Sequence, residues 1–491
     1  MGLTILLASA FLFLAYLSYA PPLHPNAPPF TSDKNLLIGS YGFFTKRWSF
    51  FKDSREHSKT GQFSFWLGKN HVVGITGEKA RRGFLENRNL DFVSGAPLHG
   101  VGPESVPPIH DIYVAPAQGH SYFQRRVLDI MQPEYLTKRL PLVTKDACDY
   151  FSSMRKNSSG MINPIGVCYR LVLQQSSRVM CADDIAEAPV LLDSYVNWTT
   201  LLLHVSSGHT MCTPWLPSIQ HMKRMYGRWG MKRLVTPIVE KRTSAGAHHG
   251  EDALQMMVDK GDSKDYMITF FINALFISVA HSGKLAGAVL NMLANHTDWQ
   301  DTIYGEIQAT ANKYATNKDL PLDEQLNSFS LEAWESLSSF IEILFKEVLR
   351  LHIIFPMVRQ NVGSSPVPIS GTKYVIPVGS FAAYNTGDAH FDEKLYPNPQ
   401  TLNPLRFAKE HDKSKKETYA FLGWGNGRHR CVGQRWAKLQ QNIIIAYALA
   451  MYQWSACDAN GQSVGPSDHK TDFDKHSNKL PQGIFLKHVP R

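Results

Sequence analysis

The chain has 491 residues, 43% of them hydrophobic, and a formal net charge of +9. This hydrophobic share is ample for a sizeable buried core. The lysines and arginines are dispersed and no aromatic–basic repeat occurs, which argues against nucleic acid as a partner. The charge fits an acidic protein partner or an anionic membrane surface instead.

Six cysteines show neither paired nor metal-finger spacing, which favours a reducing compartment over a disulfide framework. A chain of this length ordinarily holds about two to four domains, although large single folds also reach it. No Ser/Gly-rich linker and no repeat divides the chain after residue 30. We therefore expect one large, mainly helical domain over residues 31–491.

The N-terminal segment is apolar. Residues 3–20 carry no charge and are about long enough to span a bilayer. A cleaved signal peptide is the alternative, but no Lys or Arg precedes the apolar run and no disulfide-rich chain follows. The proline-rich residues 21–30 predict a stiff, extended linker. We therefore expect a transmembrane anchor at residues 1–20 followed by this linker.

Residues 61–80 predict a β-hairpin followed by a helix. The Gly- and Pro-rich residues 95–118 predict a flexible loop, and the run from Gln124 to Leu128, which includes Arg125 and Arg126, opens a helix. Residues 140–260 predict weakly patterned helices. Within them Pro214-Trp-Leu-Pro217 is either an exposed apolar knot or a buried turn.

Residues 265–296 predict a long apolar helix of about 48 Å at 1.5 Å per residue. Near its middle stand His281 and Ser282, and Lys284 is unusual on so apolar a helix. A histidine in a buried helix is more often a satisfied core residue than a proton relay.

Residues 333–352 predict the next helix, on which Glu347 and Arg350 share one face. Their apolar neighbours predict burial, and a buried pair needs a further partner for the guanidinium donors. Residues 374–379 predict an alternating strand that ends in a turn.

The last element is a glycine-punctuated loop, Phe421-Leu-Gly-Trp-Gly-Asn-Gly-Arg-His-Arg-Cys431-Val-Gly433, followed by a helix over residues 434–451. It places a cysteine near a helix N-terminus, where the dipole and the three preceding basic residues are expected to lower the thiol pKa. Such a thiolate suits an iron ligand, because it favours O–O cleavage at haem iron. The alternative is a buried cysteine in an ordinary loop.

This loop resembles the haem loop of cytochrome P-450 monooxygenases, Phe-x-x-Gly-x-Arg-x-Cys-x-Gly. Trp424 replaces the usual phenylalanine and His429 replaces the usual arginine. The run from Gly427 to Gly433 is most similar to the loop of sterol 14α-demethylases. The resemblance is specific over residues 341–440 and loose before residue 260. It implies a mainly α fold with small β-sheets (α+β), the cytochrome P-450 fold.

The resemblance also implies roles for individual residues. Cys431 would be the axial ligand of the iron of heme b. The other implied cofactor-binding residues are His429, Arg359, Trp424 and one of Arg125 and Arg126. Proton delivery to bound oxygen would use His281 and Ser282. A buried triad of Glu347, Arg350 and Arg406 would brace the haem loop.

The implied function is that of a microsomal member of this family. Its catalytic domain would face the cytosol from the endoplasmic reticulum membrane, receive electrons from an NADPH-dependent flavoprotein reductase and oxidise a hydrophobic small molecule. The loop style and Trp424 suggest a fungal biosynthetic enzyme of secondary metabolism, acting on a polyketide or terpenoid.

Three alternatives remain open. The chain could couple phenols oxidatively without net oxygen insertion, or act as a sterol demethylase-like enzyme, although residues 95–235 match that group poorly. It could also be a non-catalytic binding or transport protein on the same scaffold.

Overall fold

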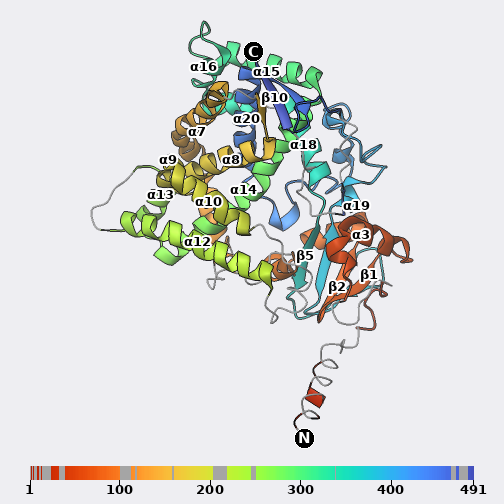
Figure 1. The fold of residues 1–491 in the computed structure, drawn as a ribbon. Helices are drawn as coiled ribbons and strands as arrows, with labels where there is room; N and C mark the ends of the chain where they lie inside the picture. The colour runs from red at the N-terminus through yellow and green to blue at the C-terminus, as the bar shows by residue number, and fades with distance from the viewer. Residues whose placement is uncertain are drawn as a thin grey trace.

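The computed structural model describes residues 24–31, 39–99, 112–116, 119–156, 160–202, 218–244, 250–337, 339–465, 472–474 and 485–491, with five isolated positions before residue 14. The anchor expected at residues 1–20 falls almost wholly outside them, as do the Pro214–Pro217 knot and most of the 95–118 loop. The described residues form a mainly helical structure with small sheets (Figure 1).

The helices are α2 (Gly42–Thr45), α3 (Arg47–Glu56), α4 (Glu78–Glu86), α5 (Phe92–Gly95), α6 (Tyr122–Ile130), α7 (Pro133–Ser153), α8 (Pro164–Met180), α9 (Asp183–Glu187), α10 (Pro189–Leu202), α12 (Ile219–Arg242), α13 (Ala253–Asp259), α14 (Lys264–Ala294), α15 (Thr297–Tyr314), α16 (Leu322–Leu326), α17 (Leu331–Ser336), α18 (Ser339–His352), α19 (Gly387–His390) and α20 (Gln434–Met451). The short 3₁₀ turns are η1 (Ala96–His99), η4 (Met154–Lys156), η5 (Pro404–Phe407), η6 (Lys413–Lys416) and η7 (Gly427–His429).

The strands are β1 (Phe63–Leu67), β2 (Asn70–Ile75), β3 (Leu90–Asp91), β4 (Met161–Ile162), β5 (Pro356–Asn361), β6 (Val367–Pro368), β7 (Val375–Ile376), β8 (Phe381–Asn385), β9 (Tyr452–Cys457) and β10 (Phe485–Pro490). The largest sheet has the order β1-β2-β8-β5-β3, with β2 and β8 parallel and the other neighbours antiparallel. The other sheets have the orders β4-β10-β9 and β6-β7.

The predicted hairpin is confirmed as β1 and β2, and α4 is the helix that follows it. The strand predicted at residues 374–379 is shorter, covering only Val375–Ile376. Pro377 lacks the N–H that a ladder needs, and Gly379 turns the chain at a φ of +74°. The longer strand β8 follows that turn, and because all five of its residues are buried, it shows no polar alternation.

The helix α14 runs through the middle of the molecule (Figure 1). Among the described residues it is the one helix long and apolar enough to cross a membrane, but 67% of its most apolar window is buried. It packs along α8, where Gly287 permits close approach. A Cβ at that position would lie 3.1 Å from the main-chain oxygen of Pro164. It is therefore a core helix, and its middle part can line a site.

The single helix predicted over residues 333–352 is wrong in one respect, because the chain forms two helices, α17 and α18. Leu337, with a ψ of +76°, ends α17. The hydroxyl of Ser336 donates to the main-chain oxygen of Ala333 at 2.7 Å, which competes with helical hydrogen bonds. The Glu306 carboxylate then accepts from the N–H of Phe340 at 3.1 Å, satisfying a donor at the start of α18.

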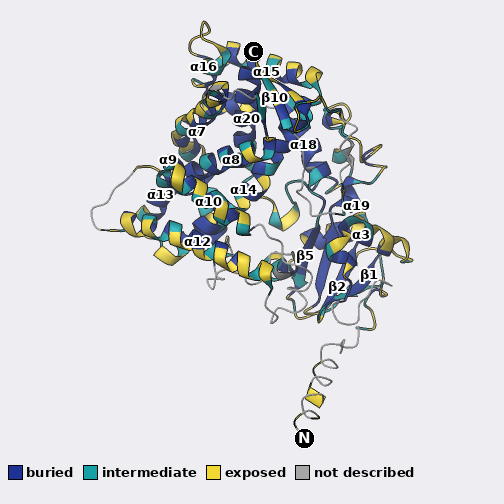
Figure 2. Cartoon of the chain, in the orientation of Figure 1, coloured by how far each residue is buried: buried dark blue, intermediate teal, exposed yellow. Residues whose placement is uncertain are grey.

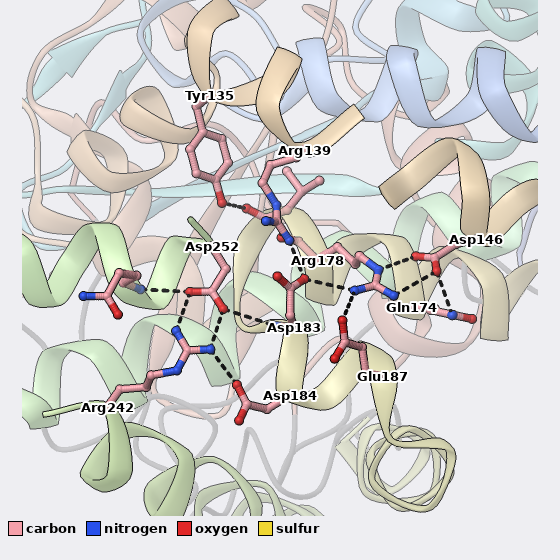
Figure 3. A network of polar contacts seen from close by, with 12 residues as sticks. Tyr135, Arg139, Asp146, Gln174, Arg178, Asp183, Asp184, Glu187, Arg242 and Asp252 are labelled. Atoms are coloured by element: carbon pink, nitrogen blue, oxygen red, sulfur yellow. Dashed lines mark hydrogen bonds and ion pairs between the residues drawn. The ribbon is translucent and has the colours of Figure 1, made fainter. Parts of the chain in front are cut away.

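A buried ionic network joins α7, α8, α9, α12 and α13 (Figure 3). Arg178 on α8 donates to Asp146 on α7 at 2.8 Å and to Asp183 on α9 at 3.2 Å. Arg242, at the end of α12, binds Asp252 with both terminal nitrogens at 3.0 and 2.8 Å. Because these groups are paired and hydrogen-bonded, the network fixes the end of α12 against the helices beneath it.

Candidate active site

The loop before α20 is held by main-chain hydrogen bonds. The N–H of Cys431 donates to the oxygen of Trp424 at 2.8 Å, and the N–H of Gly425 donates to the oxygen of Leu422 at 2.9 Å. Gly427 has a φ of +64°, and a Cβ there would lie 2.5 Å from the main-chain oxygen of Leu85. Only glycine suits this position, and the loop is therefore pressed against the end of α4.

Cys431 lies three residues before α20, and its side chain is accessible to solvent. Desolvation by the surrounding chain raises the pKa of its thiol, while the N–H of Gly433 and the guanidinium of Arg430 act in the opposite direction. The prediction of a lowered pKa is therefore wrong for the protein alone, because burial outweighs the helix terminus and the basic neighbours. Coordination to a metal ion would itself deprotonate the thiol.

The middle of α14 carries an accessible stripe on an otherwise buried helix. Ile277 is 43% exposed, and His281, one turn further on, is also accessible. Yet desolvation lowers the pKa of His281, and the charge of Lys284 adds to this effect. Ile277 and His281 therefore form the accessible face in the middle of α14, where the surrounding chain partly desolvates the imidazole.

Ser282 points elsewhere. It is buried, and its main-chain oxygen accepts a hydrogen bond from Nε2 of Gln441 on α20 at 3.2 Å. The structure thus places α14 beside the helix that follows Cys431. The sequence analysis gave His281 and Ser282 one shared role, but the structure shows an accessible side chain for His281 and a buried one for Ser282.

Positive charge gathers beside the loop. Arg359 on β5 is 2% exposed, and its Nη1 donates to the main-chain oxygens of Phe84 at 2.6 Å and Leu85 at 3.0 Å. No carboxylate lies within ion-pair distance of it among the described residues. Burial, and then the charge of Arg428, lower its pKa to about 10, although the charge of Asp91 acts in the opposite direction. Burial, and then Arg359, lower the pKa of His429 to about 4, again against the charge of Asp91. A buried cation that lacks an ion-pair partner among the described residues favours an anionic ligand.

The two adjacent arginines on α6 differ in their partners. Arg126 donates to Asp262 from Nε at 2.6 Å and from Nη2 at 2.5 Å, and to Asp129 from Nη1 at 3.0 Å. Arg125 is exposed, and in the described part of the chain it donates only to the main-chain oxygen of His120, at 3.5 Å. The guanidinium of Arg126 is therefore committed, which leaves Arg125 as the candidate for an anionic ligand.

The structure brings Glu347, Arg350 and Arg406 together. Arg350 donates from Nε and Nη2 to the two oxygens of Glu347, both at 2.8 Å, and neither residue is exposed. Arg406 adds a third hydrogen bond from Nε at 3.0 Å, and the N–H of Asn403 adds a fourth, also at 3.0 Å. The guanidinium partner that the sequence analysis expected is present.

His390 is a residue that the sequence analysis missed. Its main-chain oxygen accepts from Nη1 of Arg350 at 2.7 Å, and its Nε2 accepts from the N–H of Leu422 at 3.0 Å. A contact between a side chain and a distant main-chain group leaves no trace in residue spacing. His390 lies within residues 341–440, where the resemblance to the family is specific, but that resemblance alone does not show this contact.

These residues fit a haem. Cys431 offers an accessible sulfur, while Arg359 is a buried cation with no acidic partner among the described residues. The indole Nε1 of Trp424 is buried and has no hydrogen-bond partner in the described part of the chain. One accessible thiol, together with a buried cation that has no ion-pair partner among the described residues, matches an iron centre with anionic side groups. The fold and site thus define a haem-thiolate protein.

Comparison with known protein families supports the assignment as a haem-thiolate protein. The family model for cytochrome P-450 matches residues 28–480, and the chain therefore belongs to the cytochrome P-450 family. The cytochrome P-450 monooxygenase AacuE of Aspergillus aculeatus is 49% identical over 496 residues, covering 100% of this chain and 99% of that protein. The cytochrome P-450 monooxygenase nsrP of Aspergillus novofumigatus is 39% identical, covering 100% and 96%. The chain is accordingly a haem-dependent monooxygenase with fungal relatives.

Two more distantly related proteins are also similar to this chain. The sterol 14-alpha demethylase CYP51C of Gibberella zeae is 24% identical, covering 93% of this chain and 90% of that protein. The solved structure of retinoic acid bound cyanobacterial CYP120A1 has a TM-score of 0.71 at 17% identity, covering 95% of this chain and 100% of that one. The expected fold is confirmed, and the similarity to sterol demethylases is weak.

Proposed function

We propose that this chain is a membrane-anchored haem-thiolate monooxygenase that hydroxylates or otherwise oxidises a hydrophobic small molecule of fungal secondary metabolism, of polyketide or terpenoid class. An NADPH-dependent flavoprotein reductase supplies its electrons. The observation that carries the proposal is the accessible Cys431 at the end of the glycine loop, together with the buried Arg359, which has no ion-pair partner among the described residues. The fungal relatives support the biosynthetic role.

The residues of the site would then have separate roles in binding the haem. When bound, the haem supplies activation of dioxygen, and thiolate ligation favours O–O cleavage. Cys431 would hold the iron, and Arg359, His429 and Arg125 would hold the carboxylate side groups. The internal hydrogen bonds of the loop and its close packing against the end of α4 keep the loop in position, which is the contribution of the protein to cofactor chemistry.

His281 can move a proton at a defined atom. Its Nδ1 lies 3.1 Å from the main-chain oxygen of Ile277, and because a carbonyl only accepts, Nδ1 carries the proton. Its lowered pKa keeps the ring neutral near pH 7, which leaves Nε2 able to accept a proton and pass it on. The buried Ser282 supports the same helical turn through its carbonyl bond to α20.

The segment that follows α18 is apolar, which suits an apolar substrate. Ile354 is 2% and Met357 is 8% exposed, so both belong to the packed core, whereas Ile353 and Phe355 are only partly buried. Ile353, Phe355 and the exposed Ile277 of α14 would supply hydrophobic surface to the substrate, and such apolar surface is typical of small-molecule pockets.

The outer face of α12 supports membrane contact. Its first three turns expose five large apolar side chains, each more than half accessible: Ile219, Met222, Met225, Tyr226 and Trp229 (Figure 2). Arg233 lies over the Trp229 ring at 5.3 Å. Aromatic side chains mixed with cations are typical of membrane interfaces. Together with the anchor at residues 1–20, this face would hold the protein on the endoplasmic reticulum membrane, with its catalytic domain in the cytosol.

The membrane proposal is tested by removing each contact. Deleting residues 1–20 should leave part of the protein on anionic vesicles, and adding Met225→Glu with Trp229→Glu should release that remainder. The matched control is Lys241→Glu, at the other end of α12. A deletion variant that is already free of vesicles in low salt would rule out the contact by α12.

The reaction is tested with isotopically labelled dioxygen. Microsomes carrying the chain and a reductase would be supplied with NADPH and with polyketide, terpenoid and sterol substrates. Oxygen insertion predicts label in the product. Turnover without label would instead support oxidative phenol coupling, and turnover confined to sterols would support the demethylase alternative.

A further inference from the structure

His390 lies between the buried triad and the loop that carries Cys431. It is fully buried at the end of α19. Arg350, whose guanidinium binds Glu347, donates from Nη1 to the main-chain oxygen of His390 at 2.7 Å. The Nε2 atom of His390 accepts from the N–H of Leu422 at 3.0 Å. A single residue thus contacts the triad through its main chain and the loop through its ring.

The hydrogen bonds continue from Leu422 to the cysteine. The oxygen of Leu422 accepts from the N–H of Gly425 at 2.9 Å, and the oxygen of Trp424 accepts from the N–H of Cys431 at 2.8 Å. The ring of His390 also stacks on that of Phe421, with centroids 5.7 Å apart. His390 therefore fixes the first residues of the loop by both a hydrogen bond and ring packing.

The triad does not make this connection by itself. In the described part of the chain, Arg350 donates to Glu347 and His390, and Arg406 donates to Glu347 and to main-chain oxygens of residues 397–401. None of these hydrogen bonds reaches residues 421–433. Polar contact between the triad and the loop passes through His390.

The ring is in the chemical state that this contact needs. Burial, and then the charge of Arg350, lower the pKa of His390 to about 3, so the ring is neutral near pH 7. Because Nε2 accepts, the proton is on Nδ1, which has no partner among the described residues. The bond to Leu422 is thus the polar interaction that the ring contributes.

We propose that His390 is a positioning residue that connects the Glu347–Arg350 pair to the haem loop and holds the Cys431 sulfur where it can bind iron. The inference rests on the proposed role of Cys431 and adds a link between two elements that are distant in sequence. Losing one buried hydrogen bond shifts an equilibrium by about fivefold. The ratio of thiolate-ligated to unligated haem should fall by that factor when the acceptor is removed.

The test compares variants of the full-length, haem-loaded protein. His390→Phe keeps a ring to stack on Phe421 but removes the acceptor, whereas His390→Gln restores an acceptor near the Nε2 position. The control is His352→Phe on α18, because His352 also has a lowered pKa and a buried Nε2 without a partner among the described residues. The readout is the ferrous carbon-monoxide spectrum, which reports thiolate ligation, at matched haem content.

We expect His390→Phe to lower the ratio of thiolate-ligated to unligated haem about fivefold, His390→Gln to restore most of it, and the control to keep the wild-type ratio. Equal thiolate shares in wild type and His390→Phe, or an equal loss in the control, would overturn the inference. Should His390→Phe bind no haem, His390→Gln is compared with His390→Met, and equal shares overturn it. A wild-type protein without the band would overturn the role of Cys431 and this inference with it.

Discussion

Replacing Glu347 by glutamine tests whether the buried triad supports haem binding. The carboxylate accepts hydrogen bonds from Arg350 twice, from Arg406 and from the N–H of Asn403. The amide removes the charge that two guanidinium groups share and turns an NH₂ toward one donor. Because Glu347 and Arg350 are fully buried, water cannot replace the lost partner. Breaking such a pair costs about 3–5 kcal/mol.

The assay is urea unfolding followed by tryptophan fluorescence, together with the haem-to-protein ratio. Glu342→Gln on the same helix is the matched control, because Glu342 is about one-third exposed and pairs with Lys438 at 2.7 Å. A partly exposed pair is worth about 1 kcal/mol or less. We expect Glu347→Gln to lose haem and Glu342→Gln to keep it. Equal stability and haem content in the two variants would refute the argument.

Three further predictions concern residues around the site. Arg125→Leu should weaken haem retention with unchanged urea unfolding, whereas Arg126→Leu should mainly lower the free energy of unfolding; the reverse pattern would exchange their roles. His281→Leu should raise peroxide release per electron with nearly unchanged substrate binding, because it removes the ring nitrogen that passes the proton on, whereas Ser282→Ala keeps the main-chain oxygen that Gln441 binds and should not; equal peroxide release in wild type and His281→Leu would exclude His281 from proton delivery. Acid should destabilise the fold, because His352 and His390 have folded pKa values of about 4 and 3, against 6.5 in the unfolded chain. The unfolded chain binds more protons below pH 6.5, so each should cost about 1 kcal/mol between pH 6.5 and 5.5, and urea unfolding that is equal at both pH values would contradict this.

Elements with a strong local signal could be predicted from the sequence. The helix expected at residues 434–451 has those bounds in α20, and the hairpin at residues 63–75 follows from alternation and its turn. The break between α17 and α18 could not be predicted, because it depends on Glu306 of α15 capping Phe340 from a distance. The strand β8 was missed because a fully buried strand shows no alternation.

The site was predictable where neighbours in sequence act together. Glu347 and Arg350 are one helical turn apart, so their pairing follows from spacing. The choice between Arg125 and Arg126 needed the position of Asp262. The thiol pKa of Cys431 was wrongly predicted, because the sequence shows the basic neighbours but not the desolvation that outweighs them.

The central claim is that Cys431 binds the haem iron, and the ferrous carbon-monoxide spectrum of Cys431→Ala tests it most directly. Cys457→Ala is the control, because Cys457 is buried on strand β9 and lies outside the haem loop. We predict that the wild type and the control show the thiolate band and that Cys431→Ala lacks it and has no turnover. A thiolate band retained in Cys431→Ala would contradict the assignment.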